Sequence, residues 1–284
     1  VDGLRFEGSG VIPIGVDMED PTAFFNAGFE MDGSFRQSGS AFQMTAVEDG
    51  QPVNIEATAG SGEVDVAFSG SGVEYLGGGT DLSVNVVGGE IPFPIAFTME
   101  KVGYEFVMPL AASEDEQDFA FGLTLGGLSV PDMLWNIFDP SAILPRDPAT
   151  VAFTLDGKTR LFSDLMDPSI EDAEEFPGEL TALTLSDFVV EIAGAELTGE
   201  GDFTFDNSDL DSFDGMPRPT GAADFRLLGG NGLLDKLIQM GFVSNEDAMG
   251  ARMMMGLFAR PGSAEDELTS RIEVTEEGHV LANG

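Results

Sequence analysis

The sequence predicts a mainly β protein with a few short helices, an α+β fold built on a long curved antiparallel sheet. Apolar residues alternate with polar ones in short runs, Asp-Gly and Gly-Gly pairs separate many of these runs, and 42% of the residues are hydrophobic. Period-two alternation is typical of antiparallel strands with one face toward a core and one toward water. This much apolar material indicates a folded chain, and its 23 Phe residues are expected mostly inside.

Residues 1–111 are predicted to form an antiparallel β meander. Asp49-Gly50 separates two alternating runs as a hairpin turn would, and Asp32-Gly33 is predicted to be a turn as well. Pro92 and Pro94 each remove a backbone donor, so their strand is expected at an edge. The predicted strands are centred on residues 29–31, 42–46, 53–57, 64–68, 82–86, 91–99 and 104–108.

Residues 112–284 are predicted to mix strands with short helices. Helices are expected near 131–138 and within 232–258, where Ser244 is the N-cap of the second helix. Asp156-Gly157 is predicted to be a turn, and Glu277-Gly278 to join a terminal hairpin. The run Met253–Met255 is either core or, if exposed, an adaptable apolar surface.

This second part contains two similar units, at about 119–162 and 223–282. Leu125-Gly126-Gly127 and Leu228-Gly229-Gly230 are each followed at the same spacing by a short helical pattern. We interpret each unit as a strand, a short helix and a hairpin, with Trp135 and Ile238 in equivalent positions. Chance similarity is the alternative. The two parts of the chain are either separate or continuous as one elongated sheet.

The chain is strongly acidic, with 51 Asp and Glu against 12 Lys and Arg, which gives a net charge of −39. Such a charge repels nucleic acids, so no nucleic-acid partner is expected. Adaptation to a salty medium is the first explanation, and a cationic partner or bound divalent metal is the second. The densest acidic stretches, Ser113–Asp118, Glu171–Glu175 and Ser263–Glu267, are predicted to be solvated turns.

The sequence predicts no catalytic residue, and we expect a non-enzymatic protein. Cysteine is absent, His279 is the only histidine, and no Gly-x-Ser-x-Gly elbow accompanies a serine. A hydrolase using two carboxylates stays open, because any two acids can meet in space. No uninterrupted apolar stretch approaches the roughly 20 residues of a transmembrane helix. The start at Val1-Asp2-Gly3 reads as a mature or trimmed segment.

The best candidate for a metal site is the loop from residue 206 to residue 215. Calcium prefers six to eight oxygen ligands on a flexible loop, and Asp206, Asp209, Asp211 and Asp214 offer carboxylates there. The spacing departs from that of an EF-hand, because the glycine comes late and no Glu closes the loop. The alternative is an acidic exposed loop without a cofactor.

Two stretches of the chain are similar to a known family. They are Leu134–Pro140 with Leu144–Thr150 and Leu155–Gly157, and then Leu233–Met240 with Arg271–Val274 and Gly278–Gly284. They resemble DUF2125, a domain-of-unknown-function family of alphaproteobacterial envelope proteins. This resemblance implies a periplasmic or exported protein, with the chain as the C-terminal portion of a longer one. The closing pattern is also similar to that of AsmA-like envelope proteins, which are thought to hold lipids in an apolar groove.

Two hypotheses about function follow. The first is a non-enzymatic envelope protein with a structural or lipid-handling role, whose partner is a lipid or another envelope protein. The second is a calcium-dependent surface or adhesion module built on the loop at residues 206–215. The carboxylate-pair hydrolase is a remote third.

Overall fold

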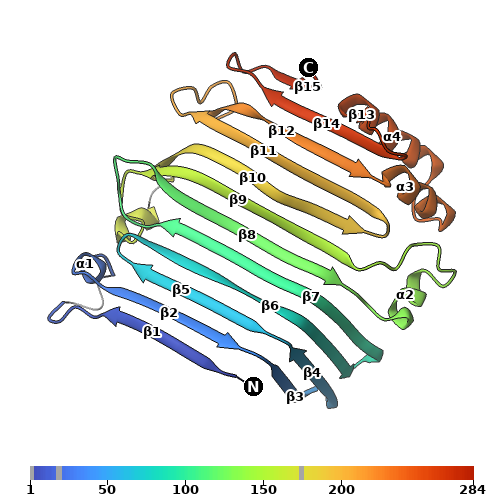
Figure 1. Ribbon diagram of the computed structural model, residues 1–284, viewed down its shortest axis with the longest axis horizontal. Coiled ribbons are helices and arrows are strands. Elements are labelled where there is room, and N and C mark those ends of the chain that lie inside the picture. Colours follow the sequence, from blue (N-terminus) through green and yellow to red (C-terminus); the bar gives the residue numbers. More distant parts are fainter. Residues whose placement is uncertain (1–2, 17–20, 173–175) are drawn as a thin grey trace.

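One open antiparallel sheet of fifteen strands dominates the computed structural model, which describes residues 3–16, 21–172 and 176–284 (Figure 1). The prediction of a mainly β fold with a few short helices is therefore confirmed. Along the chain the elements are β1 (Arg5–Val11), α1 (Pro21–Asn26), β2 (Glu30–Gln37), β3 (Ser40–Glu48), β4 (Gln51–Ala59), β5 (Gly62–Ser69), β6 (Gly72–Gly88), β7 (Ile91–Pro109), β8 (Gln117–Leu128), α2 (Asp132–Phe138), β9 (Ala149–Leu161), a 3-10 helix (Pro168–Asp172), β10 (Gly178–Ile192), β11 (Ala195–Asp206), β12 (Arg218–Leu228), α3 (Gly230–Gln239), α4 (Asn245–Phe258), β13 (Arg260–Pro261), β14 (Glu267–Val274) and β15 (Val280–Ala282).

The strands follow one another across the sheet almost in chain order. The path runs β1-β2-β5-β6-β7-β8-β9-β10-β11-β12-β14-β13, while β4 pairs with β3 and β6, and β15 pairs with β14. Because β7 pairs with β8, the parts before and after residue 111 form one continuous sheet. Twelve neighbouring strands at about 4.8 Å spacing make this sheet roughly 50 Å wide.

Strands β2 to β5 form one long hairpin with a continuous register. Glu30 pairs with Ser69 and Glu48 pairs with Gln51 in a single register, so β2–β3 and β4–β5 are the two arms of one hairpin. Its turn is Asp49-Gly50, as predicted, with φ of 48° and 80° at the two residues. Positive φ at both positions is the geometry that suits the twist of a two-residue hairpin.

Two predicted turns are wrong, because Asp32-Gly33 lies inside β2 and Asp156-Gly157 lies inside β9. Gly157 stands opposite Phe119 on β8. A Cβ atom at Gly157 would come within 2.2 Å of the Phe119 ring. Glycine is therefore used at this position for close approach of a ring and not for a turn.

The proline-containing strand is central over one half and an edge over the other. β7 lies between β6 and β8, but β8 pairs only with Lys101–Val107 of it. Pro92 and Pro94 fall in the part of β7 that extends past β8. Among the described residues this part forms its ladder with β6. The loss of their backbone donors is tolerated there because that edge is open.

The helices lie at the ends of the strands, where α2, α3 and α4 share one end of the sheet and α1 lies at the other (Figure 1). All three helices predicted near 131–138 and 232–258 are present, and Ser244 caps α4 by accepting a hydrogen bond from the backbone N–H of Asp247 at 3.0 Å. α1 was not predicted from the sequence. Its Phe24 and Phe25 rings pack with Phe29, which follows the helix, and Phe25 also packs on Phe68 of β5.

Both proposed repeat units place a helix between two neighbouring antiparallel strands. In the first unit α2 joins β8 to β9, and in the second α3 and α4 join β12 to β14. The second unit contains α4 and β13 in addition. The duplication and the equivalence of Trp135 with Ile238 stay predictions.

The molecule has very little buried core for its size. Among the described residues nine apolar ones are buried, five of them alanines, and no phenylalanine is. The accessible surface is 16961 Å², whereas a compact protein of this mass exposes about 11,700 Å². The expectation that most Phe rings are inside is therefore wrong. A single-layer sheet has no second layer to cover them.

Candidate functional site

One face of the sheet is apolar from β5 to β14. Directly opposed residues share a face, and the alternating register therefore sorts the side chains into two sets. A first row across the strands is Val66, Tyr75, Phe106, Phe121, Leu155, Leu185, Gly201, Ala223 and Ile272. A second row on the same side is Gly79, Val102, Leu125, Val151, Val190, Leu197, Leu227 and Leu268. We call this side the apolar face.

The apolar face is open to solvent. Tyr75, Phe106 and Phe121 are 43%, 37% and 46% exposed. α1 covers only the corner near Phe68, and the other helices lie beyond the strand ends (Figure 1). Exposed apolar patches on soluble monomers rarely exceed a few hundred Å², and larger ones mark binding surfaces. This face crosses the nine strands from β5 to β14, which is about 40 Å at the usual strand spacing, and it is far larger.

Aromatic rings lie across glycines of the neighbouring strand on this face. The directly opposed pairs are Gly77 with Tyr104, Gly157 with Phe119 and Gly199 with Phe225. In each pair a Cβ atom added to the glycine would meet the ring at 2.6 Å or less. The rings therefore cover backbone that would otherwise be bare, which keeps the apolar face smooth and strengthens the strand pairing.

Tyr75 and Tyr104 bring the two tyrosine hydroxyls of the chain onto the apolar face. Their rings stack with centroids 5.0 Å apart, and the Tyr104 hydroxyl donates a hydrogen bond to the Tyr75 hydroxyl at 3.4 Å. Burial, together with this hydrogen bond, raises the pKa of Tyr104 to about 12. The Tyr104 hydroxyl therefore stays neutral at physiological pH, and the pair adds two polar groups to an apolar surface.

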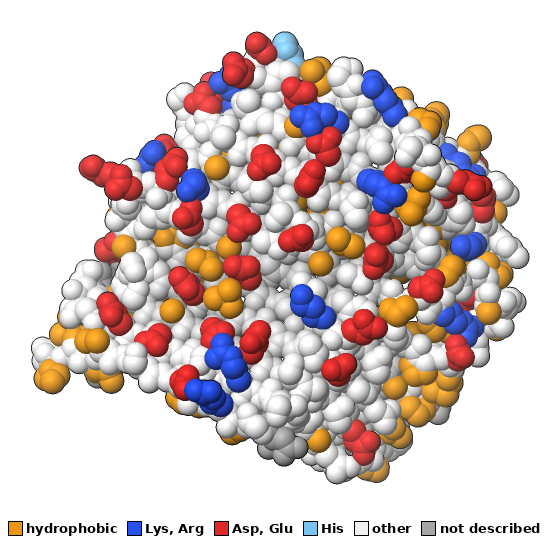
Figure 2. Space-filling model, viewed as in Figure 1, with side chains coloured by type: hydrophobic (Ala, Val, Ile, Leu, Met, Phe, Trp, Pro, Cys, Tyr) orange, Lys and Arg blue, Asp and Glu red, His pale blue; other side chains and the backbone are white. Residues whose placement is uncertain are grey.

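The opposite face is polar and charged. One row on this side, from β5 to β10, is Asp65, Leu76, Glu105, Gly122, Thr154 and Ser186, of which four are polar or charged. Figure 2 shows Asp, Glu, Lys and Arg spread across the sheet on the face that it displays. On the last strands Arg226 bridges Glu196 at 3.0 Å and also pairs with Glu267. The sheet is thus amphipathic as a whole, with one apolar and one charged side.

Glu267 corrects the prediction that Ser263–Glu267 is a solvated turn. Its side chain is buried, and it accepts hydrogen bonds from the backbone N–H of Ala264 at 2.7 Å and from Arg226. These donors hold its pKa at about 2. Asp266 accepts hydrogen bonds from the backbone N–H of Gly232 at 2.8 Å and from Asn231, at the start of α3. Both carboxylates are structural.

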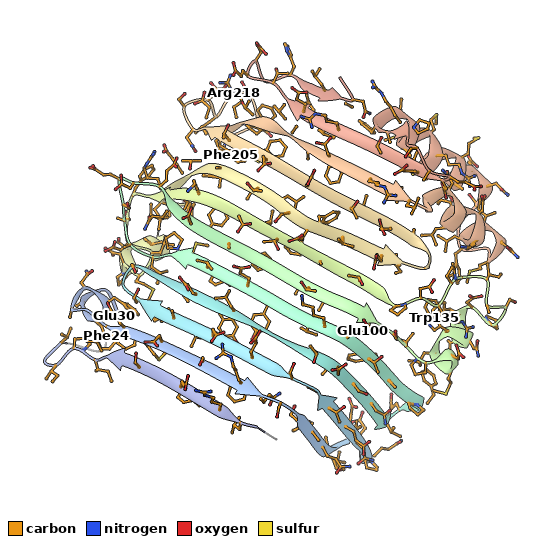
Figure 3. The ribbon with its side chains drawn as sticks, in the orientation of Figure 1. Phe24, Glu30, Glu100, Trp135, Phe205 and Arg218 are labelled. Carbon is orange, nitrogen blue, oxygen red and sulfur yellow. The ribbon has the colours of Figure 1, made fainter. Side chains whose placement is uncertain are left out.

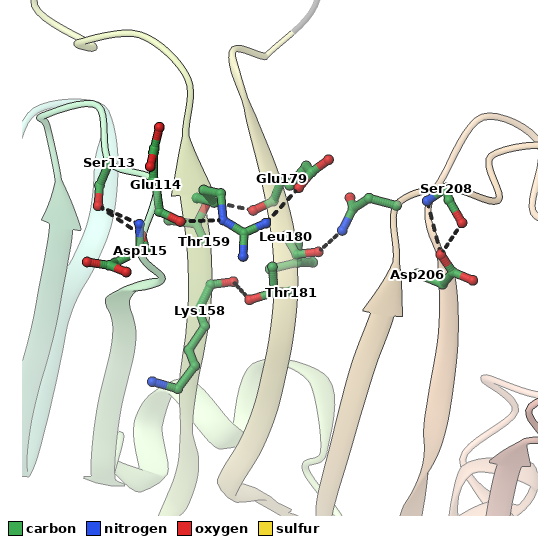
Figure 4. Close-up of polar contacts among 12 residues, drawn as sticks. Ser113, Glu114, Asp115, Lys158, Thr159, Glu179, Leu180, Thr181, Asp206 and Ser208 are labelled. Carbon is green, nitrogen blue, oxygen red and sulfur yellow. Dashed lines mark hydrogen bonds and ion pairs between the residues drawn. The ribbon is translucent and has the colours of Figure 1, made fainter.

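The stretch Ser113–Asp118 and the described residues of Glu171–Glu175 lie at the strand end opposite α2–α4. Ser113 and Asp115 bond within their turn, and Arg160 donates to the backbone oxygen of Glu114 at 2.9 Å and to Glu179 at 3.2 Å (Figure 4). Residues 173–175 of the stretch Glu171–Glu175 lie outside the described residues.

The calcium candidates lie in the loop between β11 and β12, at this same acidic end. Asp206 accepts hydrogen bonds from Ser208 (Figure 4). Asp209 accepts them from Ser212 at 2.8 Å. These hydrogen bonds lower the pKa of both carboxyls. Asp214 has a φ of 54° in the turn that precedes Gly215.

A cationic side chain already lies between two of these candidates. The Arg218 guanidinium is 2.8 Å from Asp206 and 3.6 Å from Asp209. Figure 3 labels Arg218 at this end of the sheet. Among the described residues no group of three or more His, Asp or Glu is arranged to hold a metal ion. The calcium site stays a prediction. Arg218 would compete with a calcium ion for the carboxylates of Asp206 and Asp209.

The only histidine, His279, lies in the turn between β14 and β15, next to the first residue of β15. Its backbone oxygen accepts from Thr275 at 3.0 Å, and Thr275 and Gly278 complete the turn. Among the helices described, none has the length and apolar character to cross a bilayer.

Comparison with known families gives a match over most of the chain. Residues 49–282 match the model described as "Uncharacterized protein conserved in bacteria (DUF2125)". The chain belongs to DUF2125. The match runs from the β3–β4 turn to the last residue of β15, and it contains most of the apolar face and all of α2–α4.

The description of DUF2125 gives no function, so membership in the family assigns no function to this chain. No curated protein and no solved structure matches the sequence. The comparisons do not show the similarity to AsmA-like proteins.

Proposed function

We propose that this DUF2125 member is a non-enzymatic protein of the bacterial envelope, periplasmic or exported, that binds the acyl chains of lipids on its apolar face. The observation that carries the proposal is a single-layer sheet whose apolar side is open to solvent across most of its strands. The envelope location rests on the resemblance of the chain to exported and membrane-anchored proteins.

The chemistry of the apolar face suits flexible hydrocarbon. Its side chains are aliphatic or aromatic in the two rows that cross the sheet, and Tyr75 and Tyr104 contribute its polar atoms near the centre. Rings that lie over glycines make the surface smooth, so a flexible chain can settle along it in many registers. Burial of each CH₂ group contributes about 0.8 kcal/mol, and a long acyl chain offers many such groups.

Charge also supports a lipid over a polar ligand. The chain carries a net charge of −39, yet the two rows of the apolar face contain no ionisable side chain except Tyr75. The carboxylates lie on the opposite face and at the strand ends. A neutral hydrocarbon therefore meets no desolvated charge when it covers the apolar face.

Lipid extraction and mass spectrometry of the purified protein test the proposal. We expect acyl lipids to co-purify, and a fluorescent fatty acid to bind to the delipidated protein and to compete with them. Protein that carries no acyl lipid and binds no fatty acid would sink the proposal. A second copy covering the face is the other outcome, and a dimer in light scattering would identify it.

A further inference from the structure

The helical end of the sheet carries an apolar surface of its own. On α2 the exposed apolar residues are Met133, Ile137 and Phe138, and on α4 and the turn before it they are Phe242, Met249, Met253, Met254, Leu257 and Phe258. We call this set the apolar rim. Figure 1 places α2, α3 and α4 along one end of the strands, and Figure 2 shows hydrophobic side chains gathered at that margin.

α4 turns its apolar residues outward, which reverses the usual arrangement of a surface helix. Met249, Met253 and Leu257 follow one another at i, i+4 and i+8, and each is 64–65% exposed. The inward side instead holds Ala248, which is fully buried, and Arg252. Arg252 bonds to Asp235 at 2.7 Å and to Asn231 at 3.2 Å of α3. A helix in water normally buries its apolar stripe, so this stripe is available to a partner.

The rim is poor in carboxylates in a chain that is otherwise rich in them. From Ala248 to Ala259 there is no Asp or Glu, and Arg252 is the one charged residue. The two long connections at the helical end, 129–148 and 229–266, contain eight acids and four Lys or Arg. At the opposite end, segments 110–116, 162–170, 207–217 and 275–279 contain ten acids and no Lys or Arg in fewer residues.

Acids near the rim are held by the protein itself. Asp139 is buried and accepts hydrogen bonds from the backbone N–H groups of Ile143 and Leu144, both at 2.9 Å. Asp132 pairs with Arg146. These contacts keep negative charge away from the exposed apolar side chains, so the two ends of the sheet differ in both charge and polarity.

We propose that the apolar rim docks the protein on a lipid bilayer surface, with α4 lying in the interface and the strands leading away from it. An interfacial helix buries its apolar side about 5–10 Å into the headgroup region, and Met, Leu and Phe are suited to that depth. The rim offers no cluster of Lys and Arg, so the surface that it fits is zwitterionic and not anionic. The net charge of −39 keeps the chain from anionic bilayers at low salt.

The rim is continuous with the apolar face. Val151 at the start of β9 and Ile192 at the end of β10 are 39% and 53% exposed, and both point to the apolar side at the helical end. A lipid that leaves the bilayer at the rim therefore reaches the apolar face without crossing the acidic loops. The docking surface deepens the proposed function, but binding to a bilayer can be measured without it.

Trp135 provides the reporter, because it is the only tryptophan and lies on α2 (Figure 3). It is half-buried and packs on Phe138 with ring centroids 5.0 Å apart. We expect the wild-type protein to float with vesicles of phosphatidylcholine and its emission to be quenched by phosphatidylcholine brominated on the acyl chains. Vesicles with equal parts phosphatidylglycerol should bind less protein at low salt, and the difference should shrink as salt is added.

A matched pair of double variants locates the surface. Met253→Glu with Leu257→Glu places two charges on the rim, and Met216→Glu with Leu210→Glu makes the same changes on exposed residues of the acidic end. Because all four side chains are exposed, both variants should keep the circular dichroism and melting temperature of the wild type. We expect the rim variant to lose about tenfold or more in vesicle partitioning, and the control variant to bind as the wild type does.

The outcomes are distinct from those of the acyl-chain test. A rim variant that floats and is quenched like the wild type would overturn the docking surface. The docking surface would also be overturned if the wild-type protein did not bind phosphatidylcholine vesicles. The same holds if the wild type formed dimers that the rim substitutions dissociate. If the rim variant no longer binds vesicles but still binds the fluorescent fatty acid, both proposals stand. If vesicles bind and fatty acid does not, the rim stands and the acyl-chain proposal falls.

Discussion

Phe106 on β7 and Phe121 on β8 stand directly opposite each other at the centre of the sheet, and each exposes more than a third of its surface. In a two-layer protein this pair would be core. Here it lies in the middle of an open apolar face. Because both rings are already partly in water, their removal should affect ligand binding more than folding.

Phe121→Ser is therefore expected to weaken binding of a fluorescent fatty acid several-fold while lowering the free energy of unfolding by about 1 kcal/mol. The matched control is Phe162→Ser, an equally large change at a 59% exposed residue just beyond the end of β9. Titration with the fatty acid and a urea melt measure the two effects. Equal binding by both variants would mean that the centre of the apolar face is not the binding surface.

Alternation along the chain predicted the architecture well, because a strand with one apolar side has a period that a helix cannot imitate. Alternation located most strands, while turn dipeptides, helical spacing and a capping residue located the Asp49-Gly50 turn, the helices near 131–138 and 232–258 and the Ser244 cap. The turn signal failed at Asp156-Gly157, where the same dipeptide serves close packing of the Phe119 ring. Local sequence does not distinguish a glycine that turns the chain from one that makes room for a cross-strand ring.

The candidate site was half predicted. The alternation showed that each strand has an apolar side, but it does not say what covers that side. We expected most of the 23 Phe inside because Phe is usually a core residue. The signal against this expectation was the small number of residues predicted to be helical, because helices would have to cover the sheet. Once the strands are counted, the few short helices are too small to cover a sheet of this width, and they lie at its ends.

Gly221 should be essential for the pairing of β11 with β12. It has a φ of 153°, and a Cβ atom there would lie 2.0 Å from the backbone oxygen of Asp202. Gly221→Ala is expected to reduce the free energy of unfolding by more than about 1 kcal/mol, measured by urea denaturation.

Gly256→Ala is the control for that substitution. This glycine lies within α4, and no heavy atom comes within 4 Å of the position of an added Cβ. Alanine there should stabilise the protein by about 0.5–1 kcal/mol, because glycine inside a helix costs that much. If both variants behave alike, the close approach at Gly221 is not what selects glycine.

Glu267 should make stability depend on pH. Its pKa is about 2 in the folded protein and near 4.5 when unfolded, because Ala264 N–H and Arg226 stabilise the charged form. The stabilisation is therefore complete above about pH 4.5 and is lost as the pH falls toward 2. Glu267→Gln should destabilise the protein at neutral pH, and its deficit relative to the wild type should narrow as the pH drops.

Comparison with a variant is needed for this measurement, because acid also relieves repulsion among the other carboxylates. Thermal melts of wild type and Glu267→Gln at a series of pH values remove that common effect. Glu90→Gln, in the exposed turn between β6 and β7, is the control and should follow the wild type. A deficit for Glu267→Gln that is the same at every pH would contradict the role given to its ionised form.

Salt should separate the two explanations of the acidity. Loops at the acidic end carry carboxylates in close succession, and their repulsion favours the unfolded chain unless ions screen it within a Debye length of about 8 Å. We expect the melting temperature to be lowest at low salt, and sodium chloride to raise it as well as a divalent salt does at matched ionic strength. A specific calcium site would instead raise it at concentrations of calcium too low to change screening.

Asp209→Asn with Asp211→Asn decides between these outcomes at the predicted site. Arg218 already neutralises Asp206 and Asp209, so we expect trace calcium to add nothing and the double variant to melt in salt as the wild type does. If trace calcium raises the melting temperature of the wild type and the double variant loses that increment, the loop at residues 206–215 binds calcium after all. Arg218 would then have to leave its two carboxylates when the ion enters, because the same oxygens serve both.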